Sequence, residues 1–526
     1  MTKYLLKRLI RGLISVAIVV IIVMALVYTF IDRDFIFNGD TQIQKQQHND
    51  KEVYKYTQWE RYGYLENLTY AEFLTSLEEK GEISSENRAE AVKIGRTTSL
   101  DSEITKVYVQ KFYEYCDQHG YKVVRLDAKL AGNRVPNGGE QRLFAYKEYT
   151  TLQRAWNFFK NLIQVDSIHY VEDDDQLVGE RGLSFTWYDP AYGGTKFSPA
   201  IIGNGTKYKY LVYFDNKFPF IHQNIVKINL GVSFSVNKGV DAFETMTQSQ
   251  GTNKQMLVTY PTGYQELSSD DLHMANFVKD SLTAGGSFAS ERFVDNYTNV
   301  GTVKNSMSRI GFSFVIGILS SILAYVLGVP LGIMMARNKG KILDKLGTIY
   351  IVFIIAVPSL AYIFMFRALG MKMGLPGRFD VDSETKLMYI LPIISLALPS
   401  VASLMNWLRR YMIDQQNSDY VKFARSGGLS EREIFNKHIL KNAIIPLVHG
   451  IPGTILGAVV GAIITESIYA VPGTGKMLTE AITKYDNAVI VGLTMFYALL
   501  SVVSLILGDI LMAMVDPRIS FSDKAR

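Results

Sequence analysis

The sequence predicts an α-helical polytopic membrane protein with about six transmembrane helices and a mixed α/β domain between the first and second of them. Two observations predict this fold class. Six apolar stretches are long enough to cross a bilayer, and a long segment with the composition of a water-soluble domain separates the first stretch from the other five. The mean hydropathy of the 526 residues is only +0.08 because it averages over both kinds of segment.

The first apolar stretch covers residues 9–30 and contains one charge, Arg11. About 20 helical residues at 1.5 Å each cross the roughly 30 Å hydrocarbon core. We therefore expect residues 1–30 to form an N-terminal transmembrane helix. A cleaved signal peptide is the alternative because Lys3, Lys7 and Arg8 form a positive leader, but the run is long and no small-x-small cleavage site follows it.

Residues 31–305 have the composition of a water-soluble domain. They contain 30 Lys and Arg and 36 Asp and Glu, a net charge of −6, although the whole chain carries +5. The excess basic charge therefore belongs to the apolar part of the chain. Cys116 is the only cysteine, which excludes an intramolecular disulfide and a cysteine-based metal site. A segment of roughly 270 residues can bury an ordinary hydrophobic core instead.

Five further apolar stretches form a membrane domain over residues 306–526. They cover residues 310–336, 346–366, 388–408, 443–468 and 489–514, and each is long enough to cross the bilayer. Proline and glycine recur inside them. In lipid, the backbone groups that these residues free must be satisfied by neighbouring helices or by a water-lined cavity. Close helix packing through small residues and bends that shape a translocation path both remain open.

Lys and Arg cluster on one side of the predicted bundle. They concentrate at residues 337–345 and in a loop at residues 409–441, and the basic residues of both termini fall on the same side if there are six crossings. The positive-inside rule then predicts a multi-pass plasma-membrane protein with cytoplasmic termini and an extracellular domain at residues 31–305. Basic charge placed beside membrane stretches argues against nucleic acid as a partner.

The loop at residues 409–441 contains the signals of a short helix. Ser430 and Glu433 form a capping box, in which each side chain satisfies a backbone donor of the other residue. Gly427 and Gly428 just before it permit a sharp change of chain direction. We expect a helix over residues 429–437. The residues alone leave open whether it is an ordinary connector or a helix that docks a soluble partner.

Two runs in this loop, YVKFARSGGLSERE at residues 420–433 and KHILKNAIIP at residues 437–446, resemble the conserved loop of the oligopeptide/dipeptide class of ABC-transporter permeases. In that family the loop forms a coupling helix that sits in a cleft of the ATPase subunit. The wider importer family begins the loop with Glu-Ala-Ala, whereas this sequence has Lys422, Phe423 and Ala424 there and keeps Gly428.

Other stretches resemble the same class in the same order, at residues 229–233, 327–337, 466–475 and 516–519. The resemblance implies the ABC importer permease fold. Short members of the class lack a counterpart of residues 38–210. A long insertion after the first helix, together with the run at residues 209–224, resembles the Ami-type oligopeptide permeases of streptococci and their relatives, and suggests a Gram-positive source.

The resemblance implies a translocation subunit of an ATP-driven oligopeptide importer that is not itself an enzyme and binds no cofactor. Its expected partners are a second permease subunit, two ATP-binding subunits that hold ATP and Mg, a peptide-binding lipoprotein, an oligopeptide substrate and membrane lipid. A membrane sensor or receptor with a large extracellular ligand-binding domain is the alternative. The residues assigned to ATPase coupling are Ala424, Gly428, Leu429, Ser430, Arg432, Glu433, Phe435 and His438.

The stretch at residues 443–468 supplies candidates for a translocation path. Peptides share a backbone but vary in side chain, so a path for many of them needs a wide lining of small residues. The candidates are Gly453, Gly457, Gly461, Thr465 and Glu466. Packing against the partner permease is the alternative for each glycine, and interfacial positioning is the alternative for Glu466.

No catalytic or metal motif is complete. The run PGTGK at residues 472–476 resembles a phosphate-binding loop, but that pattern needs Gly at position 470 and Ser or Thr at position 477, where the chain has Ala470 and Met477. The acidic run at residues 172–175 lacks the ordered Gly and the distal Glu of a calcium loop. The seven histidines include no pair at metal-ligand spacing.

Overall fold

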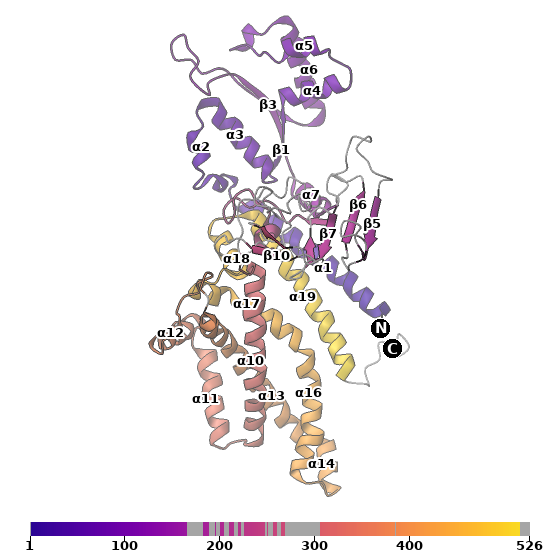
Figure 1. Cartoon of the computed structure of the whole chain (residues 1–526), viewed down its shortest axis with the longest axis vertical. Coiled ribbons are helices and arrows are strands. Elements are labelled where there is room, and N and C mark those ends of the chain that lie inside the picture. Colours follow the sequence, from indigo (N-terminus) through magenta and orange to yellow (C-terminus); the bar gives the residue numbers. More distant parts are fainter. Residues whose placement is uncertain are drawn as a thin grey trace.

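The computed structural model describes residues 2–165, 182–188, 195, 200–204, 210–214, 219–221, 226–247, 250, 256–259, 265–268, 306–383 and 385–515. Helices from the C-terminal half of the chain form an elongated bundle (Figure 1). A lobe built from residues 31–150 projects from one end of this bundle, and we call it the distal lobe.

Four helices within the described residues are long and apolar enough to cross a membrane, and the number rises to six if each of two bent helix pairs is one span. The four are α1 (Thr2–Phe30), α10 (Arg309–Arg337), α13 (Ile390–Gln416) and α19 (Asn487–Val515). The bent pairs are α11 (Ile342–Ala356) with α12 (Ser359–Lys372), and the helical segment 431–449 with the first part of α17 (Ile451–Tyr469). The expected α-helical membrane protein is confirmed.

The stretch at residues 346–366 is not one straight helix but two helices that meet at a sharp bend. Helix α11 ends at Ala356, and α12 leaves it at an angle of 113°. The cause is Pro358, because proline disfavours the helical conformation of the residue before it. Val357 is accordingly extended, with φ −88° and ψ 129°. The 15 residues of α11 reach only about 22 Å, which is short of the roughly 30 Å hydrocarbon core.

Small residues let α10 lie close to its neighbours. A Cβ atom added at Gly328 would lie 3.0 Å from Cβ of Leu404, and one added at Gly332 would lie 3.2 Å from Cβ of Leu408. These two glycines therefore serve close packing of α10 on α13. The apolar core between α10, α11, α12, α13 and α17 includes Phe312, Ile316, Ala324, Ile351, Tyr362, Leu391, Met405 and Ala462.

Helix α1 packs antiparallel against α19. Near its start, Arg8 forms an ion pair with Asp509, which also accepts a hydrogen bond of 3.1 Å from the Tyr4 hydroxyl. Further along, Val20 and Met24 join an apolar cluster that contains residues of α19, of α8 (Ala242–Thr247) and of α18 (Thr474–Thr483). One long side of α1 stays exposed, as expected for a helix that faces lipid.

The distal lobe has its own core around an antiparallel sheet of order β1-β3-β2, in which Leu68 pairs with Ala145 and Val124 with Phe144. Its apolar cluster includes Phe73, Phe112 and Leu143. The main elements are α3 (His48–Arg61), β1 (Leu65–Thr69), α4 (Tyr70–Glu79), α5 (Ser85–Ala91), α6 (Glu103–His119), β2 (Lys122–Leu126) and β3 (Arg142–Glu148).

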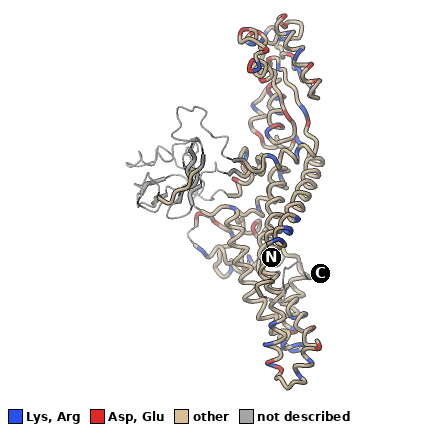
Figure 2. The backbone as a smooth tube through the Cα atoms, turned by 90° about the vertical axis from the view of Figure 1, so that its right-hand side faces the viewer, with Lys and Arg blue, Asp and Glu red and all other residues tan. Residues whose placement is uncertain are grey.

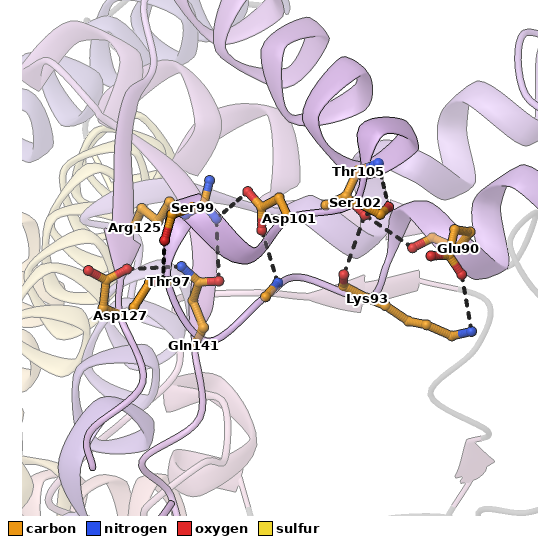
Figure 3. A network of polar contacts seen from close by, with 11 residues as sticks. Glu90, Lys93, Thr97, Ser99, Asp101, Ser102, Thr105, Arg125, Asp127 and Gln141 are labelled. Atoms are coloured by element: carbon orange, nitrogen blue, oxygen red, sulfur yellow. Dashed lines mark hydrogen bonds and ion pairs between the residues drawn. The ribbon is translucent and has the colours of Figure 1, made fainter. Parts of the chain in front are cut away.

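A buried ion pair fixes the loop before α6 to this sheet. The Arg125 guanidinium lies 2.5 Å from the Asp101 carboxylate, and both side chains are almost fully buried. Asp101 also accepts a hydrogen bond of 2.9 Å from the backbone N–H of Gly95 (Figure 3). The Thr105 hydroxyl lies 3.3 Å from the carbonyl oxygen of Glu90 and 3.4 Å from that of Lys93, so a hydrogen bond to either carbonyl holds the same loop at a second place.

After the distal lobe the chain forms α7 (Thr151–Asn161) and a series of short strands. Strand β4 (Ile163–Val165) pairs with β9 (Val226–Ile228). A four-stranded sheet has the order β5-β6-β7-β8, from β5 (Gly182–Thr186), β6 (Ala200–Asn204), β7 (Tyr210–Phe214) and β8 (Pro219–Ile221). Strands β10 (Met256–Thr259) and β11 (Gln265–Ser268) form a hairpin pair.

The distal lobe and the bundle meet at the start of α19. The buried Asp486 carboxylate accepts hydrogen bonds from the Ser233 hydroxyl at 2.8 Å and from the Ser235 backbone N–H at 2.9 Å. Next to it, the Asn487 side chain donates to the Tyr64 hydroxyl at 2.6 Å. Since these groups come from three distant parts of the chain, the joint fixes the lobe to the membrane helices.

Candidate functional site: an exposed loop tip and a small-residue face

The end of the bundle opposite the distal lobe carries the loop that the sequence singles out (Figure 1). Helix α14 (Asp419–Ser426) forms the tip, followed by α15 (Glu431–Glu433), a π-helical segment (Ile434–Ile439) and α16 (Leu440–His449). Lys and Arg are frequent here and around the N-terminus (Figure 2). The expected short helix over residues 429–437 is wrong, because no break follows residue 437 and the helix continues to His449.

The capping box that starts this longer helix is confirmed. The Ser430 hydroxyl accepts from the Glu433 backbone N–H at 3.3 Å, and the Glu433 carboxylate accepts from the Ser430 backbone N–H at 3.2 Å. Gly428 precedes it with φ +84°, in the left-handed region. The Arg425 guanidinium meets the Glu431 carboxylate at 2.5 and 3.1 Å across the turn. This geometry holds α14 at a fixed angle to the following helix.

The predicted coupling residues do not share one environment. Gly428, Leu429, Ser430 and Arg432 are exposed, and Ala424, Glu433 and His438 are partly buried. Phe435 is buried under the Arg337 guanidinium, whose carbon lies 4.9 Å from the ring centre. Its expected role in ATPase coupling stays a prediction, and the structure shows only that its side chain is buried within this chain. It belongs to a cluster that joins the loop to α10 and α13, with Ala336, Leu408, Met412, Val421, Ile434, Ile439 and Ala443.

The sequence-based assignment missed Phe423. This side chain on α14 is 76% exposed, whereas Val421 two residues earlier is fully buried in the cluster below. A large exposed aromatic side chain on a short, charged helix is a feature of interaction surfaces. Its position within the family's Glu-Ala-Ala stretch is the signal that could have identified it.

The candidate path residues on α17 also separate into two groups. Gly453 and Gly457 are exposed, and a Cβ atom added at either would meet no heavy atom within 4 Å. Ser467 and Ile464, both exposed, lie on the same side of α17, and we call this side the small-residue face after its glycines. The surroundings of Gly461 lie outside the described residues.

Thr465 and Glu466 are fully buried within this chain, so their expected place in a path stays a prediction. The Glu466 carboxylate accepts a hydrogen bond from the Ser313 hydroxyl at 2.6 Å and one from the Lys476 backbone N–H at 2.9 Å. A Cβ atom added at Gly473 would overlap this carboxylate. The run that resembles a phosphate-binding loop thus wraps around a carboxylate of its own chain. The acidic run at residues 172–175 lies outside the described residues.

Helices that cross a membrane, a capped loop with an exposed tip and an open small-residue face together describe a membrane-embedded transport component. Residues 328–521 match the protein family described as "Binding-protein-dependent transport system inner membrane component". The chain is 35% identical over 527 residues to the "Oligopeptide transport system permease protein AmiC" of Streptococcus pneumoniae, with 100% of this chain and 99% of that protein covered. The chain therefore belongs to the family of oligopeptide transport system permeases.

A shorter relative, the "Dipeptide transport system permease protein DppB" of Lactococcus lactis subsp. cremoris, is 33% identical over 226 residues, which are 42% of this chain and 73% of the relative. The chain also matches a solved structure of the MetNI methionine ABC transporter with 16% sequence identity and a TM-score of 0.31. The match covers 40% of this chain and 94% of the chain in that structure. The resemblance to Ami-type permeases is confirmed, and family membership favours a permease over a receptor.

Proposed function

We propose that this chain is a translocation subunit of an ATP-driven oligopeptide importer. It pairs with a second permease subunit, two ATP-binding subunits that hold ATP and Mg, and a peptide-binding lipoprotein. The loop tip and both termini lie in the cytoplasm, which the clusters of Lys and Arg support. Residues 31–305 then lie outside the cell. The chain makes and breaks no bonds, and binds no cofactor of its own.

The single observation that carries the coupling role is the exposed tip of α14. Phe423 offers an apolar side chain to a partner cleft, and the exposed Leu429 and Arg432 lie beside it along the chain. Burying one such aromatic side chain contributes about 1.5–3 kcal/mol. Ala424, Ser430, Glu433 and His438 form the edge of the same surface, and Gly428 sets its shape.

The buried cluster beneath the tip provides a route for movement. Val421 on α14 and Phe435 on the next helix belong to one buried cluster with Met412, which lies near the end of α13. Protein interiors are close-packed, so a displacement of α14 shifts α13 and α10 rather than being absorbed locally. The role of Phe435 in coupling is thus to transmit the movement, with no contact to the ATPase.

We further propose that Gly453 and Gly457 line the peptide path. Both lie on the open face of α17, where a wide, weakly binding surface suits substrates of varied sequence. Gly457→Trp tests this role. Lining predicts an assembled complex whose ATPase activity still responds to the loaded lipoprotein but which transports little, and long peptides least. Loss of the assembled complex would instead indicate packing against the second permease.

Purification of the complex from its native membrane tests the function as a whole. ATP-binding subunits that copurify with the chain support an importer, whereas a kinase would support the receptor alternative. Phe423→Ala should reduce the copurified ATP-binding subunits, because it removes the apolar contact. Lys422→Ala is the matched control, since its side chain is also exposed on α14. Equal recovery from both variants would overturn the assignment of the tip.

A further inference from the structure

We propose that α7 lies in the lipid–water interface at the lobe end of α1, with Leu152, Trp156 and Ile163 in contact with lipid. This membrane-contacting helix is separate from the loop tip and from the small-residue face. The inference goes beyond the proposed function, because it requires only that α1 crosses the membrane and not that the chain transports peptides.

The position of α7 is set by its contacts with the end of α1. Ala155 is buried and Phe158 packs beside it in the cluster that contains Met24. The Arg154 guanidinium lies over the ring of Tyr28, 5.0 Å from its centre. Tyr28 is two residues from the end of α1, where the apolar run gives way to charged residues. Helix α7 is therefore held at the level where the hydrocarbon region ends.

The side of α7 next to this buried face carries large exposed apolar groups. Leu152 is 74% exposed, Trp156 is 70% exposed, and Ile163, just beyond the helix, is 60% exposed. Leu152 and Trp156 are four residues apart and therefore lie on the same side of α7, and Ile163 follows at the start of β4; we call these three side chains the stripe. Ile228, which pairs with Ile163 in the adjacent ladder, is also exposed. Leaving such a stripe in water costs about 25 cal/mol for each Å².

The charge of α7 fits a lipid surface in particular. Its eleven residues include no Asp or Glu, Lys160 is exposed, and its polar side carries Asn157 and Asn161, whereas the guanidinium of Arg154 packs on Tyr28 and Tyr64. An amphipathic helix with basic residues on the polar side and Trp, Phe and Leu on the other side is typical of a segment that lies in the interface plane. Tryptophan is also enriched at this depth.

Spin-label accessibility in vesicles tests the placement. Nitroxide labels are attached to Trp156→Cys and Leu152→Cys in the full complex, reconstituted into vesicles of equal parts phosphatidylcholine and phosphatidylglycerol. Asn161→Cys, exposed on the opposite side of α7, is the matched control. The natural Cys116 can stay in place, since it is fully buried and burial raises the pKa of its thiol to about 11.

Lipid contact predicts a ratio of oxygen access to NiEDDA access that is several-fold higher at positions 152 and 156 than at position 161. The proposal would be overturned if NiEDDA reached positions 152 and 156 as readily as position 161, because the stripe would then face water. Labels that neither reagent reaches would show cover by a protein subunit, which overturns it equally. If Trp156→Cys fails to assemble, Leu152→Cys decides the result alone.

Discussion

Replacing Gly428 by valine should uncouple ATP hydrolysis from peptide uptake. The backbone of Gly428 is left-handed, with φ +84°, and a Cβ atom added there would meet no heavy atom within 4 Å. The expected cost is therefore one of backbone conformation, about 1–2 kcal/mol and more for a β-branched side chain. A penalty of this size reduces the population of the native turn by roughly 5- to 30-fold. The angle between α14 and the next helix would then no longer be fixed.

Gly374 provides a matched control for this variant. It has the same φ of +84° and the same open surroundings, but it lies beyond α12 and outside the coupling loop. Gly428→Asn is a second control, because asparagine tolerates the left-handed region. The assay measures peptide uptake per ATP hydrolysed in reconstituted vesicles. The ratio should fall for Gly428→Val alone. Wild-type coupling in that variant, or an equal loss in Gly374→Val, would refute the reasoning.

Three further predictions concern stability. Glu466→Ala should lower the melting temperature of the purified complex, because each buried donor left without its acceptor costs about 1–3 kcal/mol. Asp101→Ala should destabilise the distal lobe by about 3–5 kcal/mol, measured by hydrogen exchange, since it leaves Arg125 buried without a counter-ion. Burial alone would raise the pKa of Asp40, but hydrogen bonds from Lys238 and two other donors hold this pKa below its usual value. The ionised Asp40 therefore stabilises the folded chain, and this stabilisation is lost as pH falls through the lowered pKa. Asp40→Asn should remove that part of the pH dependence of the melting temperature.

The membrane helices were predictable because their length and composition are properties of the sequence alone. Most of the apolar stretches recur as helices close to their expected bounds. The stretches at residues 346–366 and 443–468 are bent, by 113° at Pro358 and by 44° at Gly450. The bend at Pro358 needed the geometry, since the same proline can either kink a helix or end it. The relatives, and not the geometry of the chain, favour a permease over the receptor alternative.

The candidate site was only partly predictable, because a motif specifies residues but not which of them are covered. Phe435 and Phe423 are both aromatic residues of one loop, yet one is buried under Arg337 and the other is mostly exposed. Likewise, Glu466 and Gly457 share one helix, and only the three-dimensional packing shows that one is buried and the other faces open space. Periodicity reveals an apolar side of a helix but not the neighbour that covers it.

Photo-crosslinking from position 423 tests the central proposal most directly. A photoactivatable amino acid replaces Phe423 in cells that contain the complete transport system, the membranes are illuminated, and the covalent adducts of the chain are identified by mass spectrometry. The same amino acid placed at position 374, which is also open, serves as the control. The proposal that α14 docks an ATPase predicts an adduct with an ATP-binding subunit from position 423 and no such adduct from position 374. Adducts with lipid alone, or with a protein that does not bind ATP, would contradict it.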